Sequence, residues 1–361
     1  YVDMAAHLEA VPEARAVVNF VPTLLEQIDD YARQVQHYLD NTGAIRDPLL
    51  AALAEPVLVA GSDQRLRLIR DCLRANRQRM IDRFPAYRRL ATIADWLIKH
   101  PDALLYTSEQ FFFDLLMWYH LAWLGETVRR TDVRVKRLLE QQTAYSLHDR
   151  HELLGIIGEL LASVIGRYRS LAERGQVELS VTPYAHPILP LLLDIESARE
   201  AMPDIILPTL LDYPGGEARV RWHLERGLEV FRQYFGLSPR GCWPSEGGLS
   251  EATLQLLSDY DFGWTASGES VLRHSLHKSA ENSDLCGEAS VHHAYRLGNT
   301  STTIFFRDDG LSDLIGFRYA DWKADDAVAN LVHHLENIAA ACQDQPDSVV
   351  SIIMDGENAW E

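Results

Sequence analysis

The spacing of hydrophobic positions changes about halfway along the chain. In residues 45–174 apolar side chains recur every three or four positions, as Leu153 and Ile157 do. That spacing is typical of amphipathic helices, and we expect this stretch to be almost wholly helical. From residue 175 onward, short apolar runs alternate with longer amphipathic segments. Such alternation predicts a parallel β-sheet, either open or closed into a barrel.

The individual elements follow from the same patterns. Residues 268–290 are mostly polar, and we expect a loop there. Ser250 is a plausible N-cap for the helix that follows it. Outside the long helical stretch, helices are expected over residues 1–15, 23–39, 217–235, 250–260 and 325–342, and strands over residues 16–21, 177–181, 241–243, 262–266, 292–297, 302–306 and 349–354.

Composition narrows the function classes. A chain of 361 residues can form one large α/β barrel or two smaller domains. Its net charge of −18 opposes binding to nucleic acid or to an anionic membrane, but not to a neutral sugar. No apolar stretch approaches the roughly 20 residues that span a bilayer. The four cysteines are scattered without a CxxC pair, which favours a reducing compartment, and we expect a cytoplasmic protein.

Polar and acidic residues follow several of the expected strands. The carboxyl ends of parallel strands meet at one edge, where barrel enzymes carry their active sites. After the last strand, Asp355 and Glu357 are two residues apart and so point the same way, and Gly356 leaves room for a ligand. The candidate site residues on or after these strands are Glu178, Tyr184, His186, Trp243, Glu246, Arg307, Asp308, Asp355, Glu357 and Trp360.

Two carboxylates from different strands suit the hydrolysis of a glycosidic bond. One attacks or stabilises the reacting carbon, while the other protonates the leaving oxygen. Aromatic side chains near these acids supply faces on which sugar rings stack. This chemistry needs neither a metal nor an organic cofactor.

Other interpretations of the same residues remain open. An acid after a strand is most often a helix cap or a solvated loop residue. A metal-dependent carbohydrate enzyme would use His186, Asp308 or the pair His292 and His293 as ligands. Adjacent strand residues face opposite sides, however, so that pair does not chelate by itself. A non-catalytic glucan-binding protein is the alternative from another class, although a pure binder needs no pair of acids.

Several segments together resemble glycoside hydrolase family 57. Three of them lie at strand ends: GQVE leading into TPYAHPILPLL, then GCWPSEGGLS, then IIMDGENAWE. The segments VVNFVPTLLEQIDDY, FFFDLLMWYHLAWLGE and FFRDDGLSDLIGFRYADW are similar to the same family. The resemblance extends over nearly the whole chain, and the combination in this order is highly specific.

The resemblance implies an α/β fold, an incomplete seven-stranded (β/α) barrel with a large helical insertion. Residues 1–361 would form one catalytic barrel, with residues 40–174 as the mostly helical insertion. The family's His-Gln-Pro motif on the first strand and the helical segment after the Asp-Gly-Glu strand have no match here. We therefore expect this sequence to be part of a longer protein.

The resemblance also implies roles for particular residues. Glu246, in a Trp-x-x-Glu segment, matches the nucleophile, and Asp355 matches the acid/base. Trp243 and Glu357 match substrate-binding positions. Glu178 and His186 lie in a motif that lines the site in the family.

The expected activity is that of a retaining α-glycosidase. Its substrate would be an α-glucan or a maltooligosaccharide, cleaved as an α-amylase does by double displacement. If a sugar hydroxyl rather than water accepts the glycosyl group, the same site makes a 4-α-glucanotransferase. No metal, cofactor, nucleic-acid partner or membrane is implied.

Overall fold

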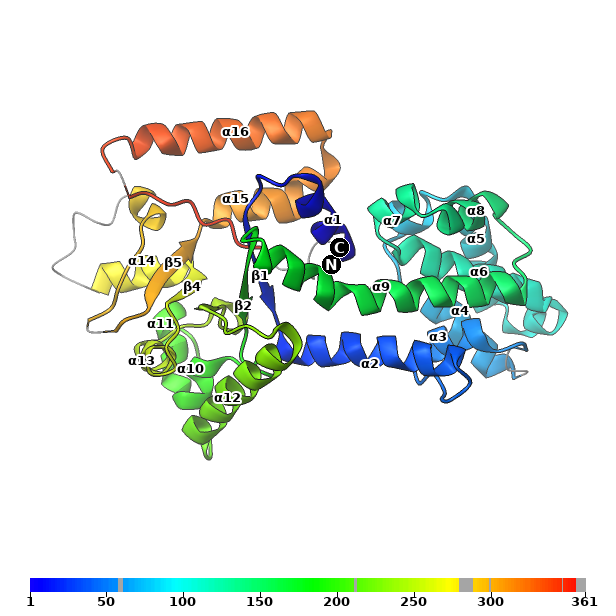
Figure 1. Ribbon diagram of the computed structural model, residues 1–361, viewed down its shortest axis with the longest axis horizontal. Coiled ribbons are helices and arrows are strands. Elements are labelled where there is room, and N and C mark those ends of the chain that lie inside the picture. Colours follow the sequence, from blue (N-terminus) through cyan, green and yellow to red (C-terminus); the bar gives the residue numbers. More distant parts are fainter. Residues whose placement is uncertain (58–60, 211–212, 279–287, 299, 346, 355–361) are drawn as a thin grey trace. The chain divides into compact units, whose positions relative to one another are not determined.

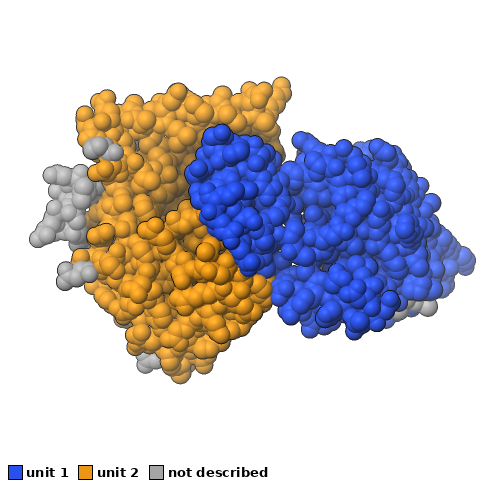
Figure 2. Space-filling view, viewed as in Figure 1, with its two compact units in different colours: residues 1–15, 27–176 blue, residues 16–26, 177–361 orange. Residues whose placement is uncertain are grey.

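The computed structural model describes residues 1–361 except 58–60, 211–212, 279–287, 299, 346 and 355–361. The chain forms two compact units, which Figure 2 colours separately. Residues 1–15 and 27–176 form the first unit, and residues 16–26 and 177–361 form the second. Among the described residues, no helix combines the length and apolar character that a bilayer-spanning segment needs.

The described part of the first unit is built of helices (Figure 1). Most residues of α6 (Glu109–Trp123) are buried, because its apolar side chains extend around the helix instead of forming one stripe. The other elements are α1 (Val2–Ala10), most of α2 (Pro22–Leu39), α3 (Pro48–Ala54), α4 (Ser62–Cys72), η1 (Arg77–Ile81), α5 (Pro85–Lys99), η2 (Pro101–Tyr106), α7 (Glu126–Thr131), α8 (Val133–Gln141) and α9 (Leu147–Glu173).

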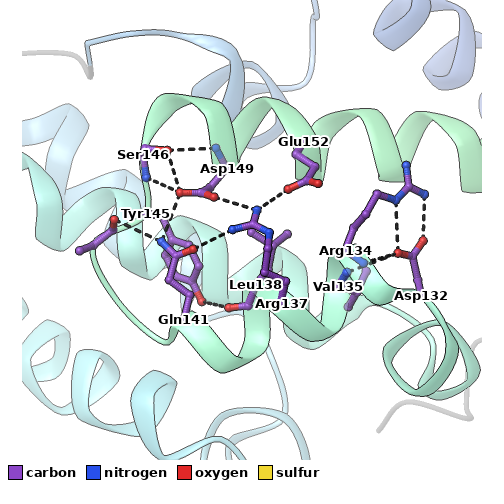
Figure 3. A network of polar contacts seen from close by, with 11 residues as sticks. Asp132, Arg134, Val135, Arg137, Leu138, Gln141, Tyr145, Ser146, Asp149 and Glu152 are labelled. Atoms are coloured by element: carbon purple, nitrogen blue, oxygen red, sulfur yellow. Dashed lines mark hydrogen bonds and ion pairs between the residues drawn. The ribbon is translucent and has the colours of Figure 1, made fainter.

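Hydrogen-bonded side chains define where α8 and α9 begin (Figure 3). Asp132 accepts hydrogen bonds from two backbone N–H groups in the first turn of α8. Ser146 and Asp149 form a capping box at α9, each accepting from the other's backbone N–H. Burial alone would raise the pKa of Asp149, but hydrogen bonds from Ser146 and Arg137 lower it below its usual range. The negative charge therefore remains at the helix N-terminus, where it is favourable.

A buried histidine makes the stability of this unit depend on pH. His120 on α6 is 8% exposed, and its Nε2 lies 3.4 Å from the carbonyl oxygen of Leu49. Burial lowers the pKa of His120 from 6.5 to about 4. Between those values the unfolded chain binds a proton that the folded chain does not, so stability decreases as pH falls.

We expect the free energy of unfolding to decrease by about 2 kcal/mol from this histidine alone between pH 7 and pH 5. The stability that the neutral His120 contributes is fully present above pH 6.5 and is lost as pH falls toward 4. Urea unfolding at both pH values should show a shallower pH dependence in His120→Gln than in the wild-type chain. Equal slopes in the two proteins would contradict the assignment.

The second unit contains a parallel five-stranded sheet in its described residues. The strands lie side by side in chain order, with β1 at one edge and β5 at the other (Figure 1). Position 241 on β3 requires glycine, because the Cβ of any other residue would overlap the indole of Trp264. The strands are β1 (Ala16–Phe20), β2 (Val177–Val181), β3 (Gly241–Cys242), β4 (Trp264–Gly268) and β5 (Thr303–Arg307).

Helices and short turns follow the strands. The N-cap of α13 is Ser250, whose Oγ accepts a hydrogen bond from the backbone of Thr253. The helices are α10 (Leu189–Leu193), α11 (Ala198–Ala201), α12 (Gly216–Phe235), α13 (Glu251–Asp259), α14 (Glu269–Lys278), α15 (Asp309–Asp313) and α16 (Ala324–Ala341). The short turns are η3 (Ile195–Ser197), η4 (Ser245–Gly247), η6 (Glu288–His292), η7 (Leu314–Arg318) and η8 (Tyr319–Asp321).

The α/β class and the parallel, unclosed sheet are confirmed. The described residues contain five of the seven strands that the resemblance implies. Residues 45–174 are mostly helical, as expected. The expectation that residues 40–174 are an insertion within one catalytic barrel stays a prediction.

Three expectations about elements were wrong. Of the loop expected over residues 268–290, residues 269–278 form helix α14, because Leu272 and Leu276 are one helical turn apart and are buried, and residues 279–287 lie outside the described residues. The first helix ends at Ala10 and not at residue 15, since Pro12 disfavours helical backbone in the residue before it. Strand β4 begins at Trp264 instead of residue 262.

Two expected strands were also wrong in their described residues. Of residues 292–297, only Tyr295 pairs with β5, through an isolated antiparallel bridge, and Gly298 then turns the chain with a φ of 52°. Residues 349–354 run beside β5 with one parallel bridge, between Arg307 and Ser351. Beyond that bridge, side chains instead of backbone groups bond this segment. Arg307 donates to the carbonyl of Ile353, and Ser312 Oγ accepts from the N–H of Ile353.

Candidate active site

Glu246 lies on a tight turn directly after β3. Its backbone has a left-handed conformation, with φ 54° and ψ 23°, and Gly247 continues it with φ 65°. The N–H of Gly247 donates to the carbonyl of Pro244 at 2.9 Å, and Ser267 Oγ on β4 donates to the carbonyl of Gly247 at 2.6 Å. Left-handed backbone is unfavourable for glutamate and persists only where the surroundings hold it, which is common at functional sites.

Glu246 lines a cavity of about 370 Å³ in the second unit. The walls come from segments far apart in the sequence: the turn after β3, the end of β4, the end of β5 and the turns after it, and residues 353–354. The lining residues are Trp243, Glu246, Gly268, Ser270, Arg307, Asp309, Ser312, Asp313, Gly316, Phe317, Ile353 and Met354.

Arg307 connects two of these walls, the end of β5 with the turns after it and residues 353–354. Its Nε donates to the carbonyl of Ile353 at 2.9 Å, and its Nη atoms donate to Asp309 at 2.5 Å and to Asp313 at 2.6 Å. Burial alone would lower the pKa of Arg307, but its hydrogen bonds to Asp313 and Asp309 raise it. The guanidinium therefore remains charged and holds the segment that leads to residue 355 beside β5.

Two aromatic side chains face the cavity with Glu246. The indole of Trp243 lies over Gly247, since a Cβ added there would be 3.1 Å from its Cη2 atom. Phe317, on the π-helical turn η7, is 50% exposed. A carboxylate that lines a cavity together with aromatic side chains can attack an electrophilic carbon of a ligand bound there. The apolar faces can hold the ligand while the carboxylate acts.

Sequence reasoning had not singled out Phe317, Asp313 or Ser270 as site residues. Phe317 and Asp313 both lie in the segment FFRDDGLSDLIGFRYADW, which carried part of the resemblance. Their place in the cavity depends on how α15 and η7 pack near the end of β5, where Arg307 donates to Asp313, and no local pattern reveals that. The one signal in the sequence was that Phe317 follows the expected strand 302–306 within a segment that carried part of the resemblance.

Glu178 lies near the opposite, amino end of the sheet. It is the second residue of β2, and its Oε1 accepts a hydrogen bond at 2.6 Å from the indole of Trp264, the first residue of β4. Glu178 is not a lining residue of the cavity. The substrate-binding role expected for it stays a prediction, while its observed contact joins two strands.

Tyr184 and His186 follow β2 at the carboxyl edge but do not line the cavity. The hydroxyl of Tyr184 donates to Glu26 at 2.6 Å. His186 is exposed and has a left-handed backbone, with φ 57°. Both belong to the loop that borders the Glu246 turn, because Ile188 of that loop packs against Gly248.

Asp308 is buried and acts as the N-cap of α15, accepting from the backbone of Leu311 at 2.8 Å. Its other oxygen lies 3.1 Å from Nε2 of His292, and Nδ1 of His292 lies 3.9 Å from Sγ of Cys342. Asp308 lines a neighbouring cavity of about 470 Å³ beside α15 and α16, not the cavity of Glu246. Within the described ranges, no three His, Cys, Asp or Glu side chains gather as metal ligands would.

Asp355, Glu357 and Trp360 lie outside the described residues. The two residues that precede Asp355, Ile353 and Met354, line the cavity together with Glu246. Of the residues singled out from the sequence, the cavity thus brings together Trp243, Glu246 and Arg307.

Several solved structures are similar to this chain. One is an α-amylase from Thermotoga maritima, with 10% identity over 88% of this chain and 40% of that one and a TM-score of 0.43. Another is a branching enzyme from Pyrococcus horikoshii, with 15% identity over 99% of this chain and 57% of that one and a TM-score of 0.47. This chain therefore spans about half the length of either protein.

A comparison with curated proteins gave no match. The family model described as glycosyl hydrolase family 57 matches residues 77–361. Those residues include the Glu246 turn, all of the cavity lining and most of the second unit. With well over half of its length matched, the chain belongs to glycosyl hydrolase family 57.

Proposed function

We propose that this protein cleaves α-glycosidic bonds of an α-glucan by double displacement. Glu246 is the nucleophile and Asp355 is the acid/base. The observation that carries the proposal is the cavity in which Glu246 faces Trp243 and the two residues that lead directly into Asp355. Membership of the family supports the same reaction class.

In the first step, Glu246 attacks the anomeric carbon and the bond to the leaving glycosidic oxygen breaks. Asp355 donates its proton to that oxygen, so the leaving sugar departs as a neutral alcohol. The glycosyl group is then bound to Glu246 through an ester. Trp243 and Phe317 offer the apolar faces against which the sugar ring is held during this step.

In the second step, Asp355 takes a proton from the acceptor hydroxyl, whose oxygen attacks the anomeric carbon and releases Glu246. Water as acceptor gives hydrolysis, and a sugar hydroxyl gives transfer as in a 4-α-glucanotransferase. Two inversions give net retention, which requires carboxyl groups about 5–5.5 Å apart. We assign Arg307 the task of holding residues 351–353 so that this spacing is met.

The test is the product pattern of the full-length protein with short maltooligosaccharides. Proton NMR during the first turnovers should show the α-anomer of the new product before mutarotation, because the mechanism retains configuration. Shorter products alone indicate hydrolysis, and products longer than the substrate indicate transfer.

Two outcomes would contradict the proposal. A β-anomer formed first would require inversion, with carboxyl groups more than roughly 6.5 Å apart. The absence of any turnover of maltooligosaccharides or longer α-glucans would remove the substrate assignment.

A further inference from the structure

An exposed pair of aromatic side chains lies outside the cavity. Trp222 on α12 is 51% exposed. Tyr184, in the loop after β2, meets it edge to face, with ring centroids 5.4 Å apart and planes at 86°. A single exposed tryptophan needs no explanation by itself. Trp222, however, has an aromatic neighbour in Tyr184, and polar side chains hold Tyr184 in place. We call these polar side chains, Glu26 and Arg226, the polar frame.

The polar frame holds Tyr184 in place. Its hydroxyl donates to Glu26 at 2.6 Å, and the guanidinium of Arg226 lies 5.4 Å from its ring centroid. Its backbone N–H donates to the carbonyl of His223 at 3.0 Å. Because these contacts fix the ring before any ligand arrives, binding against it would cost little conformational entropy.

Arg226, the arginine beside the ring of Tyr184, is paired with acids. It donates to Glu26 at 2.7 Å and to Glu229 at 2.8 Å, so its one positive charge faces two carboxylates. Aromatic faces next to free arginines would suit nucleic acid. Aromatic faces beside an arginine that carboxylates already pair suit a neutral polyhydroxylated ligand, whose C–H faces stack on the rings.

The loop that carries Tyr184 also borders the turn that carries Glu246. Tyr184 and Ile188 belong to one short loop, and Ile188 packs against Gly248, next to the turn that carries Glu246. Four residues span at most about 14 Å, so an oligosaccharide can reach from one place to the other. The loop with Tyr184 and the turn with Glu246 both lie on the side of the sheet where β2 and β3 end.

We propose that Trp222 and Tyr184 form a second binding site for α-glucan, outside the catalytic cavity, which holds a part of the chain remote from the bond that is cleaved. This inference rests on the proposed function for the identity of the ligand. It predicts that long glucans bind more tightly than short ones. It also assigns Tyr184 a role in substrate binding that does not require it to line the cavity.

The test measures binding in the Glu246→Gln background, so that turnover does not consume the ligand. Affinity electrophoresis in gels containing amylose should show weaker retardation for Glu246→Gln/Trp222→Ala. We expect the dissociation constant for amylose to rise on the order of tenfold, as expected from loss of one aromatic contact. Trp222→Phe, which keeps a flat ring, should retain most of the binding.

Trp96 provides a matched control, because it is 52% exposed and lies on α5 of the other unit, stacked on His100. Trp96→Ala should leave amylose binding unchanged. Equal binding by Glu246→Gln with and without Trp222→Ala, or an equal loss in Trp96→Ala, would overturn the inference.

The wild-type protein separates this inference from the proposed function. If it turns over α-glucans while Trp222→Ala leaves binding unchanged, the second site is refuted and the function stands. If it does not turn over α-glucans while Trp222→Ala weakens binding, the second site stands and the function is refuted.

Discussion

Glu246→Gln is expected to lower turnover of α-glucans by on the order of 10³-fold or more while leaving the fold intact. The amide has the same shape as the carboxylate but cannot form the glycosyl ester. The left-handed backbone of residue 246 is held by the turn itself, through Gly247 and Ser267, so the substitution should not unfold it. Single-turnover kinetics with a maltooligosaccharide would measure the loss in the chemical step.

Glu251→Gln is the matched control, because Glu251 is an exposed glutamate in the first turn of α13, shortly after the same turn. It should keep wild-type turnover. Near-native activity of Glu246→Gln, with unchanged far-ultraviolet circular dichroism, would refute the nucleophile assignment.

A second measurement identifies the nucleophile directly. In Glu246→Ala, azide can occupy the space of the missing carboxylate and attack the anomeric carbon of an α-glucosyl fluoride. The C–F bond breaks, fluoride leaves, and a β-glucosyl azide forms, because only one inversion takes place. Recovery of that product would confirm Glu246 as the nucleophile, whereas an α-glucosyl azide or no rescue would count against it.

Arg150→Met is expected to lower the free energy of unfolding of the first unit, which is helical, by about 3 kcal/mol. Arg150 on α9 is 2% exposed, and its Nη1 donates to the carbonyls of Ala52 at 3.2 Å and Glu55 at 2.6 Å, at the end of α3. Its guanidinium also lies 3.8 Å from the ring centroid of Phe113.

Two effects oppose each other at this position. Burial lowers the pKa of Arg150, which means that its charge is costly to bury, and methionine removes that cost. Methionine also leaves helix-terminal carbonyls buried without a donor and removes the contact with Phe113, and we expect these losses to dominate.

Calorimetry should show the midpoint of unfolding of this unit decrease by roughly 6–12 °C. Arg67→Met is the control, because Arg67 is exposed on α4, and it should change stability by less than about 0.5 kcal/mol. Hydrogen exchange of the α3 amides should accelerate in Arg150→Met alone. A midpoint equal to that of Arg67→Met would contradict the expectation.

Much of the secondary structure was predictable because it depends on residues close together in the sequence. Strand β2 has the expected bounds, since Val177, Leu179 and Val181 alternate with polar residues, which is the pattern of a half-buried strand. Ser250 caps α13 as expected, because capping depends only on residues within one turn. Helix α14 was missed, since its buried face consists of a few apolar residues among many polar ones.

The candidate site was predictable only in part. Trp243 and Glu246 follow β3, Arg307 ends β5, and the geometry of a parallel sheet brings such residues to one edge. Glu178 lies on a strand too, but at its amino end, where it bonds Trp264. Phe317 and Asp313 line the cavity only because the tertiary structure places α15 and η7 near the end of β5.

The sequence by itself determined the α/β class, the helical first half and the acid after β3, because periodicity and residue order are local properties. Tertiary structure alone decided which side chains surround Glu246. It also decided that residues 349–354 attach to β5 through Arg307 and Ser312 instead of a ladder, and that Tyr184 faces Trp222. Those contacts join residues far apart in the chain, and their partners become neighbours only when the sheet and its helices pack together.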